Sequence, residues 1–294
     1  MSISNPFAVL PATLKLDISK VVMAGGENSS RQPSSAVMVY DLETIPDESR
    51  FPRPNVDPTA SSVPSLDVDQ FFTACKTVEE VKKYLAKNPL SVVQYDGLIA
   101  VEQQSDKPRK GVVDEVEKWK SSVLSIFEDW KKECSTNPLK CRIVAFGWAI
   151  GNAEVESMTA TNDDEERAIC EKFWLLVSSG RRRAGYNITG FDDAVIGIRS
   201  ILLGVEPSIR LSRRKYGNTQ SLDLMSLLFP NSTAQKLKEV CAALQITVPA
   251  GDMDGSKVFD LFHEGKVEDI GAYVRSDVEV ERELMWRLRE VFDE

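Results

Sequence analysis

The sequence predicts an α/β fold in which helices cover a mixed β-sheet. Two neighbouring segments, CRIVAFGWAIG at 141–151 and EVESMTAT at 154–161, are apolar or alternating runs with a short turn between them, which is typical of a β-hairpin. From residue 162 onward, amphipathic helical patterns alternate with a short strand pattern, as in sheets that helices cover. A hairpin followed by this alternation indicates a sheet with both antiparallel and parallel neighbours.

The N-terminal 35 residues are weakly patterned, and we interpret them as an extension of a domain that spans 36–294. Within the extension, TLKLDI is compatible with a strand and GGENSSRQPSS with a loop. The first clear strand pattern is AVMVYDLET, at residues 36–44. It is an apolar run that ends in two carboxylates.

Residues 47–141, which lie between the first strand and the hairpin and are called the insertion below, are expected to contain a proline-rich loop first and helices from 68 to 135. Proline disrupts regular structure; Pro46 directly precedes the insertion, and Pro52, Pro54, Pro58 and Pro64 lie within its first 18 residues. Thr77 and Glu80 have the spacing of a helical capping box. One apolar helix face is predicted from Val116, Trp119, Val123, Ile126 and Trp130.

Three aromatic residues of the insertion, Trp119, Phe127 and Trp130, are open to two interpretations. Aromatic side chains can stack on the bases of a single strand. At helical spacing they more often form a core, which is the interpretation we favour. The insertion as a whole is compatible with a clamp over nucleic acid, a partner-binding arm or a packed decoration.

The segments after residue 162 are expected in the following order. DDEERAICEKFWLLVSSG is an amphipathic helix with acidic residues in its first turn, RRAGYN is a strand, and FDDAVIGIRSILLG is a second helix. SLDLMSLL and AQKLKEVCAALQI follow as helical segments, and a long helix runs from about residue 267 to 292.

The net charge of −9 argues against bulk electrostatic binding of nucleic acid. Basic residues nevertheless gather between 181 and 215, namely Arg181, Arg182, Arg183, Arg199, Arg210, Arg213, Arg214 and Lys215. The runs at 181–183 and 210–217 are compatible with a grip on backbone phosphates and equally with solvated loops.

The chain has five cysteines without a Cys-x-x-Cys pair and one histidine, His263, which argues against a Cys/His zinc site. A metal, if bound, is therefore expected on carboxylates, which favour Mg²⁺ or Mn²⁺. The N-terminus has no basic region ahead of its apolar residues, and no window has the roughly 18 apolar residues of a membrane span. We expect an intracellular protein with reduced thiols, neither secreted nor in a membrane.

Three acidic patterns stand out. Asp41 and Glu43 alternate along a strand and therefore share one face, where a divalent cation would offset the cost of burying them. In GYNITGFDDA, at 185–194, Asp192 lies in the first turn of the expected helix. Tyr273 and Asp277 lie four residues apart on one helix face. Taken alone, each is explained more simply by a solvated strand end, a helix-dipole acid or a surface pair.

Together and in this order, the three patterns are far more specific. VYDLETIP, GYNITGFD and YVRSD resemble the three exonuclease motifs of the DEDD superfamily, in the subgroup with tyrosine in the third motif (DEDDy). GYNITGFD closely resembles the second motif of family B DNA polymerase proofreading domains. The stretch from SLDLMSLL to ELMWRL is similar to stand-alone, polymerase-B-like 3′–5′ exonucleases. The similarity covers 36–46 and most of 141–290. In compact members of the family the second strand follows the first after a short distance, so the resemblance implies that residues 47–141 are an insertion.

The resemblance implies an RNase H-like fold, with a mixed five-stranded sheet flanked by helices. It implies that Tyr273 orients the attacking water. Two Mg²⁺ or Mn²⁺ ions would be held by Asp41, Glu43, Asp192 and Asp277. Contacts with the terminal nucleotide would come from Leu42, Thr44, Asn187 and Phe191. The histidine subgroup has its histidine five residues before the last aspartate, so His263, 14 residues before Asp277, is expected to have no catalytic role, and Asp223 is expected to be structural.

The activity that the resemblance implies is removal of nucleoside 5′-monophosphates from the 3′ end of single-stranded DNA by two-metal-ion hydrolysis. The chain is too short to include a family B polymerase, so we expect it to act alone or beside a separate DNA polymerase or other replication or repair protein. An RNA 3′ exonuclease would use the same chemistry. A catalytically inactive nucleic-acid-binding or scaffold protein on a nuclease fold is the alternative from another class.

Overall fold

A computed structural model describes residues 37–54, 68–88, 90–212, 220–230, 235–248 and 255–292. All of them belong to the second of two compact units, Ser35–Glu294. The expected strand TLKLDI and the expected loop GGENSSRQPSS lie outside the described residues. So do Arg213, Arg214 and Lys215 of the basic region.

The described strands form one five-stranded sheet in the order β3-β2-β1-β4-β5. Their bounds are Val37–Pro46 for β1, Cys141–Ile150 for β2, Glu156–Thr159 for β3, Arg182–Gly185 for β4 and Ser221–Asp223 for β5. β2 is antiparallel to both β1 and β3, whereas β4 is parallel to β1 and β5. The predicted mixed sheet of an RNase H-like α/β fold is confirmed.

The fifth strand corrects one prediction. SLDLMSLL was expected to be helical throughout, but its first three residues form β5 and only Leu224–Leu228 forms a helix, α8. Ser221, Leu222 and Asp223 pair with β4 and are all buried. Pairing with a neighbouring strand overrides the local helical pattern here, because buried backbone groups need hydrogen-bond partners.

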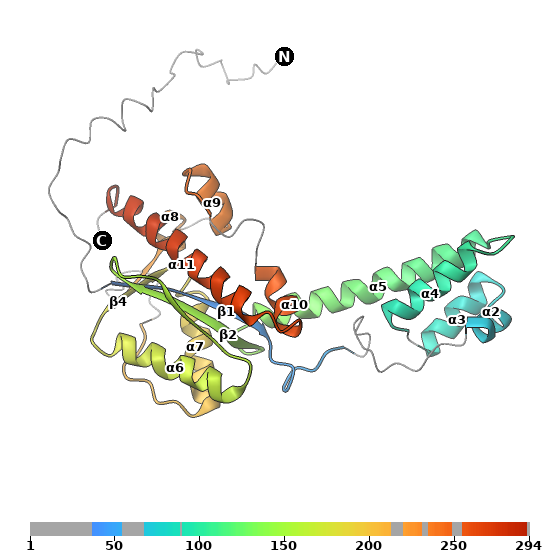
Figure 1. Cartoon of the computed structure of the whole chain (residues 1–294), viewed down its shortest axis with the longest axis horizontal. Coiled ribbons are helices and arrows are strands. Elements are labelled where there is room, and N and C mark those ends of the chain that lie inside the picture. The colour runs from blue at the N-terminus through green and yellow to red at the C-terminus, as the bar shows by residue number, and fades with distance from the viewer. Residues whose placement is uncertain are drawn as a thin grey trace, which may run out of the picture. The chain divides into compact units, whose positions relative to one another are not determined.

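Helices cover both faces of the sheet (Figure 1). α6 (Asp163–Val177) and α7 (Asp192–Leu203) pack on the face to which Met38 and Tyr40 of β1 point. α8, α9 (Leu237–Ala243) and α11 (Val267–Arg289) pack on the opposite face, with Val37 and Val39. The alternation of side chains along β1 thus divides the core into two layers.

The insertion between β1 and β2 contains four helices, which are α2 (Val68–Ala74), α3 (Val78–Lys87), α4 (Val92–Gln103) and α5 (Lys110–Ser135). They share an apolar cluster of their own, against which Trp119 packs. Phe127 and Trp130 of α5 pack instead with β1, α10 (Val258–His263) and α11. The core interpretation of the three aromatics is confirmed, and so is the Thr77–Glu80 capping box. Ile126, expected on the apolar face, is 49 % exposed.

Among the helices of the described segments, none is both long enough and apolar enough to cross a membrane.

Candidate active site

The sheet brings Asp41 and Glu43 beneath α11. Both follow Val37 and Val39 on the α11 face of β1, and Asp41 pairs with Gly147 of β2. A Cβ atom at Gly147 would lie only 2.9 Å from the carbonyl oxygen of Val274 in α11, so a side chain here would push the helix away. Glycine at this position lets α11 approach the strand that faces Asp41.

Three carboxylates converge at this crossing. Ligand oxygens of Asp41, Glu43 and Asp277 all lie within 4.8 Å of one another. Burial and the charge of Asp277 raise the pKa of Asp41 well above its usual range, and burial with the charges of Asp41 and Asp277 does the same for Glu43. Burial raises the pKa of Asp277 to about 6. A set of oxygen ligands with repelling charges is what Mg²⁺ or Mn²⁺ would stabilise, so these residues fit a divalent metal.

Tyr273 lies one helical turn before Asp277, and the two side chains are hydrogen-bonded. Burial and the charges of Glu43 and Asp277 raise the pKa of the Tyr273 hydroxyl far above its ordinary value. The hydroxyl therefore stays protonated at neutral pH. It can donate to Asp277 while its oxygen accepts from another group.

Asp192 is the first residue of α7 and is 4 % exposed. Burial, followed by the charge of Asp41, raises its pKa well above its usual range. It lies outside the group formed by Asp41, Glu43 and Asp277. The structure thus brings three of the four expected acidic ligands together and places the fourth where its charge repels Asp41.

The turn between β4 and α7 carries Asn187, whose φ of 65° is in the left-handed region. Asp223 fixes this turn. One of its carboxylate oxygens accepts from the backbone N–H of Asn187 at 3.2 Å, and the other accepts from the N–H and hydroxyl of Thr189. The structural interpretation of Asp223 is confirmed. Phe191, at the N-cap of α7, packs against the core of the α6 and α7 face.

Leu42 and Thr44 use their side chains inside the protein. Leu42 is 5 % exposed, within the core beneath α6 and α7, on the face opposite Asp41. Its backbone N–H bonds the carboxylate of Asp41. The Thr44 hydroxyl donates to the carbonyl oxygen of Ser135, at the end of α5, at 2.8 Å. Their contact with a nucleotide stays a prediction.

A cavity of about 160 Å³ opens beside Tyr273 and Asp277, between α9 and α11. Lys238 of α9 lies near enough to lower the pKa of Asp277, against the larger effect of burial. Sequence reasoning missed Lys238, which lies in a plain helical pattern. The lining of this cavity comprises Lys236, Leu237, Lys238, Cys241, Val248, Tyr273, Asp277 and Val280.

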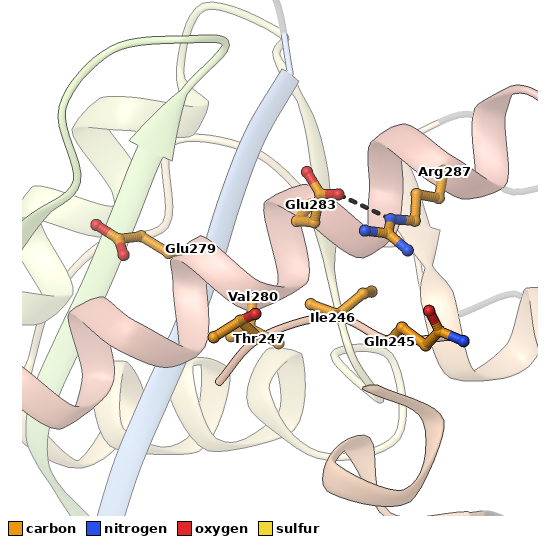
Figure 2. Close-up of a pocket in the computed structure, with 7 residues that line it drawn as sticks. All are labelled: Gln245, Ile246, Thr247, Glu279, Val280, Glu283 and Arg287. Atoms are coloured by element: carbon orange, nitrogen blue, oxygen red, sulfur yellow. Dashed lines mark hydrogen bonds and ion pairs between the residues drawn. The ribbon is translucent and has the colours of Figure 1, made fainter. Parts of the chain in front are cut away.

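A second cavity, of about 290 Å³, lies farther along α11. Figure 2 shows its lining, which comes from α11 and from the segment that follows α9. Two of the four α11 residues are acidic, Glu279 and Glu283, and Glu283 accepts a hydrogen bond from Arg287 at 2.7 Å. Negative charge at this rim disfavours phosphates.

Two arginines of the basic region have structural roles. Arg183 is fully buried and bonds Asp193, and Arg199 bonds both Glu166 and Asp47. The interpretation of Arg183 as a phosphate contact is therefore wrong, because its guanidinium is already paired inside the core. His263 is the last residue of α10, and its Nε2 atom lies 3.1 Å from Oε2 of Glu48.

The model of a protein family described as predicted 3′–5′ exonucleases related to the exonuclease domain of PolB matches residues 138–290, just over half of the chain. No curated protein matches the sequence. The matched range contains Asp192, Tyr273 and Asp277, whereas Asp41 and Glu43 lie before it and join them through the sheet. The fold, the order of the motifs and the family match agree, and the chain belongs to this family of predicted 3′–5′ exonucleases.

Proposed function

We propose that this protein removes nucleoside 5′-monophosphates from the 3′ end of single-stranded DNA with the help of two divalent cations. One observation carries the proposal, which is the convergence of Asp41, Glu43 and Asp277 within 4.8 Å in a chain that belongs to a family of predicted 3′–5′ exonucleases. The tyrosine beside Asp277 supports the DEDDy subgroup.

The reaction joins the oxygen of water to phosphorus and breaks the bond between phosphorus and the O3′ atom of the preceding nucleotide. Bound Mg²⁺ or Mn²⁺ ions would make water a stronger nucleophile and stabilise the charge on the leaving oxygen. Asp41, Glu43 and Asp277 would hold one ion, and Asp41 with Asp192 the other. The carboxylates would then lose the mutual repulsion that raises their pKa values.

Tyr273 positions the nucleophile in this scheme. Its hydroxyl donates to Asp277, which leaves the oxygen lone pairs free to accept a hydrogen bond from water. Because its pKa is raised, the hydroxyl does not serve as a general base at neutral pH. Orientation of the water in a fixed direction is the contribution that remains.

The cavity beside Tyr273 supports an approach of the strand from the α9 side. Lys236 and Lys238 line it together with apolar side chains, a combination that suits phosphates and bases. The second cavity, farther along α11, is lined by Glu279 and Glu283, which disfavour a phosphate backbone. The likeness of GYNITGFD to a DNA polymerase proofreading motif favours DNA as the substrate.

The proposal is tested with 5′-labelled single-stranded DNA and matching RNA, each incubated with Mg²⁺, Mn²⁺ or EDTA and resolved on a sequencing gel. We expect a metal-dependent ladder that shortens from the 3′ end and is faster on DNA. Faster cleavage of RNA would move the assignment to an RNA 3′ exonuclease. No cleavage of either strand by well-folded protein would overturn the catalytic assignment and leave a binding role.

A further inference from the structure

Glu281 is a buried carboxylate that none of the three motifs includes. It lies on α11, four residues after Asp277, and is 2 % exposed. Its Oε1 atom accepts a hydrogen bond from the backbone N–H of Tyr186 at 3.0 Å. Its Oε2 atom has no hydrogen-bond partner among the described residues. A buried carboxylate with an unpartnered oxygen is costly, so this position calls for a physical reason.

The free oxygen lies where α11 meets two strands. A Cβ atom at Gly185, the last residue of β4, would lie 3.2 Å from Glu281 Oε2 and 2.7 Å from the carbonyl oxygen of Tyr40 in β1. A side chain at residue 185 would collide with the carbonyl oxygen of Tyr40 and would crowd the carboxylate of Glu281, so glycine permits this close approach. Tyr40 immediately precedes Asp41, so the free oxygen of Glu281 faces the part of the sheet that carries the carboxylates.

The electrostatics of Glu281 agree with this placement. Burial raises its pKa well above the usual range, and the charges of Asp41, Asp192 and Asp277 raise it further. These three residues come from β1, α7 and α11 and include ligands expected for both ions. The buried carboxylate of Glu166 differs, because Arg199 bonds both of its oxygens.

We propose that Glu281 is a fifth carboxylate of the metal site, a positioning residue whose charge strengthens the binding of divalent cations by Asp41, Asp192 and Asp277. The inference rests on the proposed function. The N–H of Tyr186 holds one oxygen, and the other lies against Gly185 at the end of β4. Residues that support a metal site without being its direct ligands typically change metal affinity by about 10- to 100-fold.

Binding of Mn²⁺ to the metal-free full-length protein tests the inference, with free Mn²⁺ followed by electron paramagnetic resonance. Glu281→Gln keeps the size of the side chain and an acceptor for the Tyr186 N–H, but removes the charge. We expect its dissociation constant for Mn²⁺ to rise about 10- to 100-fold, while the melting temperature of the metal-free protein does not fall. Glu279→Gln, an exposed change on the same helix, should bind like wild type.

A Glu281→Gln variant that binds Mn²⁺ as tightly as wild type overturns the inference. Glu281→Met removes both the charge and the acceptor for the Tyr186 N–H. If the glutamine variant does not fold, a methionine variant that binds Mn²⁺ as tightly as wild type still overturns the inference. Equal weakening in the two variants supports a role of the charge. Weakening in the methionine variant alone assigns the effect to the Tyr186 bond and overturns the inference. Wild-type protein that takes up no Mn²⁺ would overturn the proposed function itself.

Discussion

Carboxylates are buried on both sides of the sheet, but their surroundings differ. On the side of α6 and α7, each of two fully buried acids is bonded to an arginine. Asp193 bonds Arg183 and accepts from the hydroxyl of Tyr40 at 2.8 Å, and Glu166 bonds Arg199 at 2.6 Å. These acids are neutralised within the chain, so their burial needs nothing from outside.

On the side of α11, the buried acids mainly face one another. Burial and neighbouring carboxylates raise the pKa values of Asp41, Glu43 and Glu281. Asp47, which bonds Arg199 of α7, shows the opposite shift. Burial alone would raise its pKa, but hydrogen bonds from Ser49 and Arg199 bring it below the usual range. The buried acids on the side of α6 and α7 are thus neutralised by arginines, whereas those on the side of α11 repel one another, and a bound cation would relieve this repulsion.

The largest expected effect is on catalysis. Asp41→Ala should lower turnover by several orders of magnitude, because it removes the carboxylate that we propose to bind both ions, and it should leave folding intact, since it relieves repulsion. Asp47→Ala is the matched control, six residues along the chain. It removes a partner of Arg199 and should lower stability by about 3 kcal/mol with turnover largely kept at low temperature. Turnover assays and thermal unfolding of both variants make the check. An unfolded or fully active Asp41→Ala protein would contradict the assignment.

Arg199→Met should produce the largest loss of stability. The change leaves Glu166 and Asp47 buried without their arginine, and breaking such a pair costs about 3–5 kcal/mol. Urea unfolding measures the loss. Arg287→Met, which removes an exposed pair with Glu283, is the control and should change stability by less than about 1 kcal/mol. Equal losses in the two variants would show that the buried network has no special weight.

In the metal-free protein, Asp277 and Asp47 should contribute pH dependences of opposite sign to the free energy of unfolding. A carboxyl whose pKa is raised on folding contributes stability at low pH and loses it as pH rises through the folded pKa, about 6 for Asp277. Asp277→Asn removes this loss, so the variant should gain about 1–3 kcal/mol over wild type between pH 4 and pH 7. Asp47, with a lowered pKa, contributes stability that is lost as pH falls. Thermal unfolding in EDTA at several pH values provides the measurement, and a gain that is independent of pH would count against a raised pKa of the buried Asp277 carboxyl.

Much of the sheet was predictable from the sequence because its signals are local. The apolar run in residues 36–44, the pattern of the hairpin and the amphipathic patterns of α6, α7 and α11 all depend on residues close together in the sequence. β5 was not predictable, because three residues carry too little pattern and their strand conformation depends on pairing with β4. The burial of Arg183 and Arg199 was not predictable, because the sequence around them does not indicate their acidic partners. Asp47, a partner of Arg199, lies 152 residues away.

The site shows the same limit. The convergence of Asp41, Glu43 and Asp277 was predictable, because these residues belong to motifs in a specific order. Glu281 was not, because in DVEVERE it is one of several acids on a charged helix, and only burial distinguishes it. The periodicity did hold a weak signal, since a residue four positions after Asp277 lies on the same helix face.

The smallest expected effects come from two tyrosines, one on each side of the sheet. Tyr273→Phe should lower turnover about 10- to 100-fold, because loss of a positioned hydrogen bond costs about 1.5–3 kcal/mol while the carboxylates remain. It should leave stability nearly unchanged. Tyr40→Phe removes the hydroxyl that donates to Asp193, whose bonds to Arg183 remain, so it should cost about 1 kcal/mol of stability and little turnover. Turnover and unfolding measurements on both variants show whether the Tyr273 hydroxyl acts mainly on catalysis and the Tyr40 hydroxyl mainly on stability. A Tyr273→Phe protein as inactive as Asp41→Ala would show that the hydroxyl does more than orient water.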